Sequence, residues 1–366
     1  MNSLSRLLWP ESRSLFALLA GFAVVATEDR LLAGGPWMSF AIFAVLLGAI
    51  VAVSVRVARH AEALAQRIGD PYGTMVLTLS AVLIEVVILA IIISSESSPT
   101  LVRDTIYSAV MLDINGIIGL SALIGGLKHG EQSYNDDSGR TYGVMILTAM
   151  GISMIVPEFV PPSKWHVYSI FTIFAMLTLY ALFLRMQVGQ HAGFFRYSYS
   201  AAKQEAGKDD GASPAIPVAF SIAMIVIGVA LIGYLAEIMS TFMNAGIKAT
   251  GISPALVAVV VAAISAAPEI MTALKAALRN RMQAVINIAM GASLSTVILT
   301  VPAMEAFALY NDQPLIMAMT PLQTVMVALT LVAAAINLND GETNAIEGMT
   351  HFVLFSAFIV LTALTA

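Results

Sequence analysis

The feature that most constrains this chain is a succession of apolar stretches, each about 20 residues long and bounded by charged residues. A helix of that length crosses the hydrocarbon core of a bilayer. The stretches do not alternate polar and apolar residues, so they predict helices and not barrel strands. Eleven spans are predicted, near residues 14–32, 37–57, 72–95, 103–127, 141–157, 165–185, 215–236, 251–274, 282–304, 319–338 and 347–365.

The composition leaves little chain for anything outside a membrane. Of the 366 residues, 58% are hydrophobic and 11% are charged, which leaves no room for a soluble catalytic domain, so an enzyme is not expected. A net charge of -5 without a basic run argues against nucleic acid as a partner. Without cysteines, and with five scattered histidines, a transition-metal site is not expected. Hard cations bound by oxygen remain.

The basic residues predict how the chain is inserted. With eleven spans, fourteen Lys and Arg residues fall on the side of the N-terminus and four on the other side. Because basic loops stay in the cytoplasm, we expect a multi-pass protein of the bacterial inner membrane with a cytoplasmic N-terminus and an external C-terminus. The first apolar stretch ends in Glu28, Asp29 and Arg30, which argues against a cleavable signal.

A polar stretch separates two halves of five predicted spans each. Residues 188–214 mix Gly, Ser, Lys and Asp, as a flexible cytoplasmic linker does. Residues 37–187 form the first predicted repeat and residues 215–366 the second, while residues 1–36 form an extra N-terminal helix. Because each half has an odd number of helices, related halves would insert in opposite senses, as in the inverted repeats of many secondary transporters.

The two halves share features in the same order. Each has an Ala-Glu pair, then a glycine, a proline and a lone glutamate within a span. These are Ala61, Glu62, Gly69, Pro71 and Glu85 in the first half, and Ala236, Glu237, Gly251, Pro254 and Glu269 in the second. A segment of small and polar residues begins 23 residues after Glu85 and 22 residues after Glu269. The shared order favours an internal repeat.

Glu85 and Glu269 are the first candidates for chemistry, because each is a single charge deep in an apolar span. The alternative for each is a neutral glutamate that only hydrogen-bonds a neighbouring helix, but their occurrence in both halves favours function. Two such carboxylates form a site of charge -2 for Ca²⁺ or small monovalent cations, helped by carbonyls freed near Pro268 and the glycines. Burial and mutual repulsion favour the protonated acids, so protons and cation should compete.

Other polar residues within or beside the spans are weaker candidates. Asp113 is a third intramembrane carboxylate. Neutral oxygen ligands are predicted at Asn287, Ser293 and Ser295, although helical serines often only bond their own backbone. No permanently bound cofactor is expected, because the cation and the protons are cargo.

Two further pairs lie near the predicted helix ends. Glu62 and Glu237 are predicted at opposite mouths, where they could recruit cations; a solvated position or a salt bridge to Arg59 is the alternative for Glu62. His60 and His351 could relay protons, but packing at the membrane interface is the alternative for both.

The chain resembles the bacterial calcium:proton antiporters of the ChaA type, in the cation:proton exchanger branch of the cation/calcium exchanger superfamily. The resemblance covers nearly the whole chain and is most specific in RHAEALAQRIGDPYGTMVLTLSAVLIEV, PTLVRDTIYSAVMLDINGIIGL and ISAAPEIMTALKAALRNRMQAVINIAMGASLSTVILTVP. It implies ten core helices in two inverted repeats, one extra N-terminal helix, central glutamates at Glu85 and Glu269, and export of Ca²⁺ in exchange for H⁺ by alternating access.

The chain departs from that family pattern at the predicted site. Ala81-Val82 and Ser265-Ala266 replace the Gly-Asn that the wider branch carries ahead of each central glutamate, and Asp113 stands where asparagine is usual. An added carboxylate and two lost amides shift the expected preference away from Ca²⁺ alone. A Na⁺ or K⁺ antiporter with little Ca²⁺ activity is therefore an alternative. A channel or structural membrane protein, in which the acids only hold helices together, is another.

Overall fold

A computed structural model describes residues 11–68, 72–94, 99–189, 192–195, 217–250, 253–313 and 315–365. Gly69, Pro71, Gly251 and most of the predicted linker lie outside these ranges. The described chain is helical except for loops and one antiparallel pair of two-residue strands, β1 (Gln132–Ser133) and β2 (Glu342–Thr343). The described chain is therefore of the all-α class that the apolar stretches predict, and the strand pair is an addition, because two residues carry no periodicity that a sequence pattern could reveal.

The number of spans remains a prediction. Among the described residues, seven helices are long and apolar enough to cross a membrane, or eight if a bent pair counts as one span. Three further apolar helices, Ser12–Ala26, Thr78–Ile91 and Pro321–Asn337, are shorter. All three overlap spans that the sequence predicts. These three helices are therefore where they were expected, and the total of eleven spans is untested.

The chain divides into two compact units. Unit 1 holds residues 1–101, 212–257 and 366, and unit 2 holds residues 102–211 and 258–365. Each unit takes parts of both predicted halves. A compact unit is not the same thing as a structural repeat, so the predicted boundaries of the inverted repeats remain a prediction.

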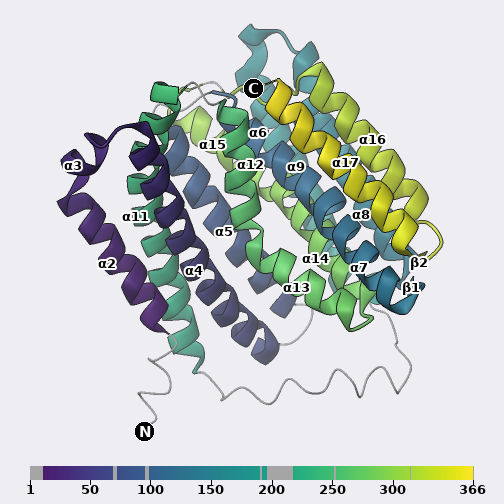
Figure 1. Ribbon diagram of the computed structural model, residues 1–366. Helices are drawn as coiled ribbons and strands as arrows, with labels where there is room; N and C mark the ends of the chain where they lie inside the picture. Colours follow the sequence, from purple (N-terminus) through teal and green to yellow (C-terminus); the bar gives the residue numbers. More distant parts are fainter. Residues whose placement is uncertain are drawn as a thin grey trace, which may run out of the picture. The chain divides into compact units, whose positions relative to one another are not determined.

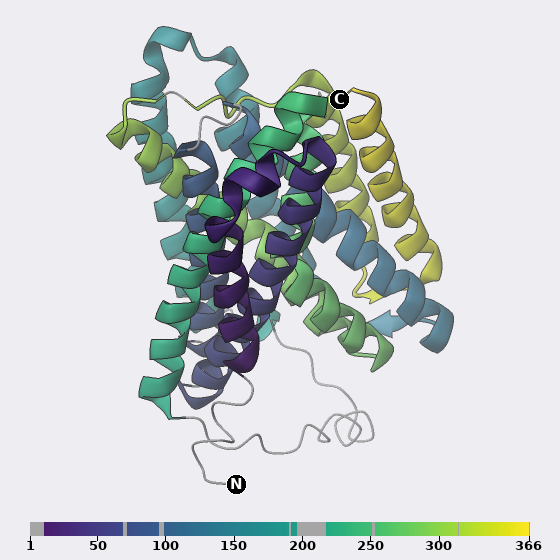
Figure 2. The ribbon, with the colours of Figure 1, turned by 60° about the vertical axis from the view of Figure 1, so that its left-hand side comes forward.

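Unit 1 is built on two long helices, α4 and α11, which pack against each other along their length (Figures 1 and 2). Its elements are α2 (Ser12–Ala26), α3 (Glu28–Leu32), α4 (Pro36–Ile68), α5 (Tyr72–Ser94) and α11 (Val218–Thr250). Helix α2 reaches α11 through Gly21, where an added Cβ would lie 2.9 Å from the Tyr234 ring. The N-terminal helix therefore packs closely on this unit.

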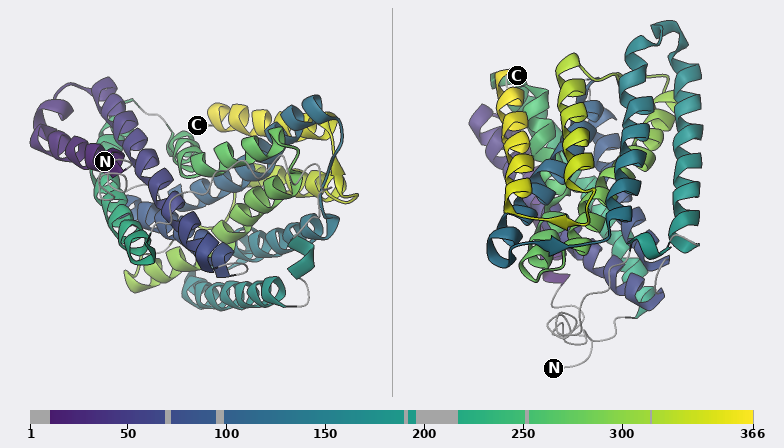
Figure 3. Two further views of the ribbon diagram at one scale, coloured as in Figure 1. Left: turned by 90° about the horizontal axis from the view of Figure 1, so that it is seen from below. Right: turned by 90° about the vertical axis from the view of Figure 1, so that its right-hand side faces the viewer.

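Unit 2 contains most of the remaining helices. They are α6 (Leu101–Met111), η2 (Leu112–Ile118), α7 (Gly119–His129), α8 (Asp136–Met150), η3 (Gly151–Ile155), η4 (Val156–Phe159), η5 (Pro162–Lys164), α9 (Trp165–Val188), η6 (Ala192–Phe195), α13 (Ala267–Leu278), α14 (Met282–Ser295), η7 (Thr296–Thr300), α15 (Val301–Tyr310), α16 (Pro321–Asn337) and α17 (Ala345–Leu364). Helix α12 (Pro254–Ser265) contributes to both units. In Figure 3 the short strands lie by the ends of α16 and α17.

The core of unit 2 lies around two helices that each contain a π-helical stretch. One is continuous through α6, η2 and α7, and the other through α14, η7 and α15. In the apolar 18-residue stretch of each helix, 78% and 67% of the residues are buried, more than in the other candidate spans. π-Helical turns are often found at functional sites, because they change which side chains face a neighbouring helix. The two stretches begin at the last residues of the small and polar segments, 108–113 and 291–296, that the sequence singles out after each lone glutamate.

Candidate functional site

Glu269 lies at a break between two helices. The helical axis bends by 54° between Ala255–Ala263 and Ala267–Leu278, and Glu269 is in the first turn of α13. Pro268 has no amide hydrogen, so the carbonyl oxygen of Ile264 lacks the usual donor four residues later. A carboxylate in the first helical turn is stabilised by the helix dipole, while carbonyl oxygens at the end of the preceding helix attract cations. The break beside Pro268 is therefore suited to a cation, and Glu269 as a ligand remains a prediction.

Glu85 has a different setting. It lies within α5, which runs without interruption from Tyr72 to Ser94. The glutamate is half-buried, and Ile84, Ile88 and Leu89 beside it are buried. Because α5 is continuous here, it offers no freed main-chain carbonyl next to Glu85. Glu85 belongs to unit 1 and Glu269 to unit 2, so a shared site remains a prediction.

Asp113 and Ser293 are brought together within unit 2. The Ser293 hydroxyl donates a hydrogen bond of 3.1 Å to Asp113 Oδ2, and the two residues are 0% and 2% exposed, respectively. Asp113 is on the π-helical η2, against which both α13 and α14 pack. The helix that carries Glu269 therefore adjoins the segment that carries Asp113. Two predicted ligands are in contact, and their role as ligands remains a prediction.

The other two predicted neutral ligands have structural partners. The Ser295 hydroxyl donates to the backbone oxygen of Gly291 at 2.7 Å, the alternative that the sequence left open for helical serines. Asn287 Oδ1 accepts from Gln283 at 3.0 Å, and its Nδ2 donates to the backbone oxygen of Phe195 at 2.9 Å. Along α14, Asn287 lies about 9 Å before Ser293. It ties the η6 segment to α14 and is distant from the Asp113 pair.

The acids predicted at the mouths are both exposed, but neither lies at the end of its helix. Helix α11 continues to Thr250, thirteen residues beyond Glu237, although a span ending at residue 236 was predicted. Glu237 therefore lies well inside a long helix, and its place at a mouth remains a prediction. Glu62 lies six residues before the end of α4 at Ile68. No ion pair joins Glu62 to Arg59 among the described residues.

Both histidines that were weighed as interfacial are buried. His60 and His351 are each 1% exposed. His351 Nδ1 lies 2.9 Å from Asn115 Oδ1, and Asn115 Nδ2 donates to the Thr330 hydroxyl at 2.7 Å. This buried network joins α17 and α16 to η2. Both side chains are therefore covered by neighbouring residues that the sequence does not identify, and packing at the membrane interface remains a prediction for both.

A second buried network in unit 1 could not be found from the sequence. Glu11 forms an ion pair with Arg56, and Glu11 Oε1 lies 3.1 Å from His60 Nε2. Glu11 is the residue before α2, while Arg56 and His60 are one turn apart on α4. The sequence offers the i,i+4 spacing of Arg56 and His60 but no sign that a residue 45 positions away covers them.

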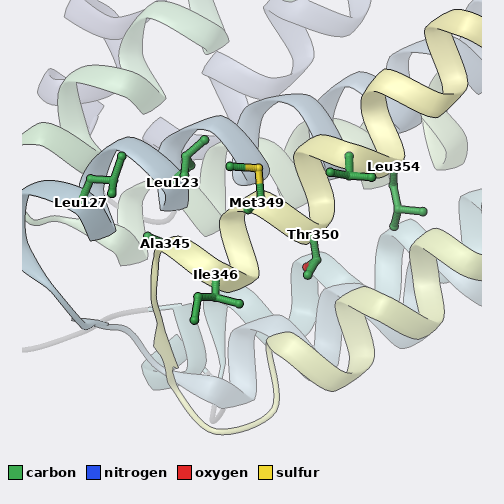
Figure 4. Close-up of a pocket in the computed structure, with 8 residues that line it drawn as sticks. Leu123, Leu127, Ala345, Ile346, Met349, Thr350 and Leu354 are labelled. Atoms are coloured by element: carbon green, nitrogen blue, oxygen red, sulfur yellow. The ribbon is translucent and has the colours of Figure 1, made fainter.

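An apolar groove of about 650 Å³ lies between α7 and α17 (Figure 4). Its walls include Leu123 and Leu127 on α7, and Ile346 and Met349 on α17. It contains none of the predicted ligands. Among the described residues, no three acids or histidines gather closely enough to hold a metal ion.

Comparison with known proteins decides the family. The sodium/calcium exchanger protein family matches residues 38–189 and 220–364. This chain belongs to the sodium/calcium exchanger family. It is a family of transport proteins, in line with the expectation that the chain is not an enzyme. Together with the long apolar helices, membership identifies a multi-pass membrane protein.

Several proteins resemble this family member over most of their length. The putative ionic transporter y4hA of Sinorhizobium fredii is 31% identical over 83% of the chain and 84% of that protein. The sodium-potassium/proton antiporter ChaA of Escherichia coli is 31% identical over 85% and 86%, respectively. The Ca²⁺/H⁺ antiporter ChaA of Bacillus subtilis is 24% identical over 96% and 98%.

A solved structure shares the fold. Native YfkE superposes with a TM-score of 0.71 at 20% identity, over 94% of this chain and 99% of that one. The resemblance that the sequence suggests is thus confirmed at the level of the family and of the fold.

Proposed function

We propose that this exchanger is a secondary active antiporter that exports a cation in exchange for protons by alternating access. The observation that carries the proposal is the helix break at Glu269, which adjoins the segment with the buried Asp113–Ser293 pair. A carboxylate beside freed carbonyls, next to a second buried carboxylate, is a hard oxygen site in a membrane-spanning unit. Relatives over most of the chain are named as cation/proton antiporters, which supports the same function.

In this mechanism Glu85 and Glu269 bind cation and protons in alternation. Both acids must ionise to hold Ca²⁺, so two protons would leave for each ion bound and the cycle would be electroneutral. Asp113 decides whether a third proton moves. If it joins the site in its charged form, exchange would respond to membrane potential; if Ser293 holds it apart from the cation, exchange would not.

Two candidates are proposed for the transported cation. Export of Ca²⁺ is supported by the Bacillus subtilis relative, named as a Ca²⁺/H⁺ antiporter. Exchange of Na⁺ or K⁺ is supported by the Escherichia coli relative, named as a sodium-potassium/proton antiporter, at the higher identity of 31%. The lost amides and the added Asp113 carboxylate favour neither ion strictly, so we keep both as cargo, with no resident cofactor.

We further propose that the N-terminus and the residues 188–214 face the cytoplasm and the C-terminus faces outside. The support is the distribution of fourteen basic residues against four. The chain has no cysteine, so single cysteines can be introduced without a background. An impermeant thiol label should reach Ala366→Cys from outside and Ala206→Cys only from inside. Labelling of both from the same side would contradict the orientation and the inverted repeats.

The function is tested by proton flux in everted vesicles with Ca²⁺, Na⁺ or K⁺ supplied in turn. Because protons and cation compete for the same acids, the half-saturating cation concentration should fall as the pH rises from about 6 to 9. A half-saturating concentration that does not change with pH would mean that protons and cation do not share the glutamates. No proton flux with any of the three ions would contradict antiport itself.

A further inference from the structure

Glu305 is a buried carboxyl group in α15 that the predicted cation site does not use. It is 3% exposed, and one of its oxygens has no hydrogen-bond partner among the described residues. Its side chain lies close enough to Ser169 on α9 to interact with that hydroxyl group. A carboxyl group at such a position is expensive to keep charged in a membrane, so it is a candidate site for chemistry in its own right.

The position of Glu305 separates it from the predicted ligands. It lies ten residues after Ser295 and five residues before Tyr310, where α15 ends and the side chain is 89% exposed. Those separations correspond to about 15 Å and about 8 Å along the helical axis. Glu305 is therefore closer to the Tyr310 end of unit 2 than to the predicted cation ligands on the same helix.

Ser169 provides a polar connection toward that end. It is half-buried in the second turn of α9, and the preceding segment from Pro161 to Lys164 is exposed. A hydroxyl group can both donate and accept a hydrogen bond. Ser169 can thus pass a proton between Glu305 and water at the exposed start of α9 without any movement of the backbone.

The groups around Glu305 do not include a positive partner. The elements packed most closely against α15 are α9 and η7. On α9, Tyr168 is close enough to interact electrostatically with Glu305, and its hydroxyl donates to the backbone oxygen of Ile152 at 2.6 Å.

The other ionisable side chains of α9 are occupied or distant. His166 pairs with Asp312 at the surface, 3.3 Å apart, whereas Tyr180 and Arg185 lie two or more turns beyond Ser169. The η7 segment has no ionisable side chain. No Lys or Arg forms an ion pair with Glu305 among the described residues.

We propose that Glu305 is a proton-binding site, separate from the predicted cation ligands, which exchanges its proton with water at the Tyr310 end of unit 2 through Ser169. Uptake adds one proton to the carboxylate and release returns that proton to water, so no other reactant is needed. The alternative is a purely structural role, in which a permanent hydrogen bond only holds α15 against α9. Glutamine would satisfy that structural role, because its amide can bond Ser169 and carries no charge.

Proton binding is tested first without transport. Infrared difference spectra of the reconstituted protein between acid and alkaline pH should contain a carboxylic acid C=O band that Glu305→Gln removes and that Ser169→Ala shifts in frequency. Asp29→Asn, which changes an exposed acid of α3, should leave the band in place. A band that is the same in wild type, Glu305→Gln and Ser169→Ala would overturn the proposal. The Ser169→Ala arm keeps the test valid if the glutamine variant does not fold.

The use of this proton in transport rests on the antiport proposed above and is tested separately. At saturating cation, Glu305→Gln should shift the pH of half-maximal exchange by about one pH unit, because the cation does not displace this proton. An unchanged pH profile, at normal amounts of folded protein, would assign Glu305 to a purely structural role. If the wild type shows no exchange, the proposed function fails, while the infrared band still decides whether Glu305 binds a proton.

Discussion

The two lone glutamates that the sequence treats as equivalents lie in unlike helices. Glu85 is within an unbroken helix of 23 residues, whereas Glu269 is in the first turn after a 54° bend. The local sequences explain the difference. Residues Leu83 and Ile84 before Glu85 continue a helix, while Pro268 before Glu269 removes an amide donor. Two halves with the same order of residues therefore need not have the same backbone conformation at their lone glutamates.

The comparison predicts different contributions from the two acids if both bind the cation. Beside Glu269, the carbonyl oxygen of Ile264, which Pro268 deprives of its usual donor, could join the carboxylate in a coordination shell. Beside Glu85, the backbone of α5 is fully engaged in its own helix, so this glutamate can contribute only its side chain. If both acids bind one cation, most of the oxygen ligands should come from the side of Glu269, with Asp113 and Ser293 on the adjoining helices.

The largest expected effect comes from neutralising either acid. Glu85→Gln and Glu269→Gln should each abolish exchange in vesicles, because half of the site's negative charge is lost, while neutral glutamine is cheaper to bury than a charged group. Purified protein should remain folded by circular dichroism and gel filtration. Asp29→Asn is the matched control for the loss of one carboxylate. Near-normal exchange by both glutamine variants would refute a shared site.

The next effect tests the broken helix itself. Pro268→Ala returns an amide donor to α13, so α12 and α13 should straighten and withdraw the carbonyl of Ile264 from the site. We expect about a tenfold weaker apparent cation affinity with the maximal rate less affected, since the carboxylates remain. Pro321→Ala serves as the control, because Pro321 is the first residue of α16, where a missing donor has no cost. Equal effects of the two substitutions would show that the bend at Glu269 is irrelevant to binding.

A smaller effect is expected at the buried pair beside that break. Ser293→Ala removes a hydrogen bond to Asp113 and should lower stability by about 1 kcal/mol, measured as a reduced melting temperature in detergent. Asp113→Asn keeps a partner for Ser293 and removes a possible charge. If Asp113 is ionised during transport, the asparagine variant should lose any dependence of exchange on membrane potential. A dependence that both proteins share would exclude Asp113 from the moving charge.

The smallest effects are expected from the exposed acids. Glu62→Gln and Glu237→Gln should change the apparent cation affinity by less than about threefold, and only at low ionic strength, because exposed charges are screened by salt. Rates at about 10 mM and 150 mM of an inert salt measure this. A large loss that persists at high salt in Glu237→Gln would give this residue, which lies well inside α11, a role at the cation site.

Much of the architecture is predictable because it follows from local patterns. The apolar stretches predict where the helices are, since a hydrocarbon core requires helices of a given length. Pro268 predicts a break, since the chemistry of one residue removes a hydrogen bond. The family follows from three stretches of sequence. These statements depend on residues that are near each other along the chain.

Contacts between distant segments cannot be predicted from the sequence. The bonds of Ser293 to Asp113 and of His351 to Asn115 join residues 180 and 236 positions apart. His60 and His351 are typical interfacial residues by their local pattern, yet both are buried. Glu305 follows Met304 in an ordinary apolar run, and only its burial against α9 makes it a candidate site.

The sequence by itself determined a membrane-embedded exchanger of helices, with isolated acids in apolar segments and a break at Pro268. The tertiary structure decided which distant groups the polar residues in those segments meet: Asp113 meets Ser293, Asn287 meets the backbone of Phe195, and Glu305 lies beside Ser169. The physical reason is that a helix forms through bonds between residues three to five positions apart. The partner of a buried side chain depends instead on which neighbouring helix covers it.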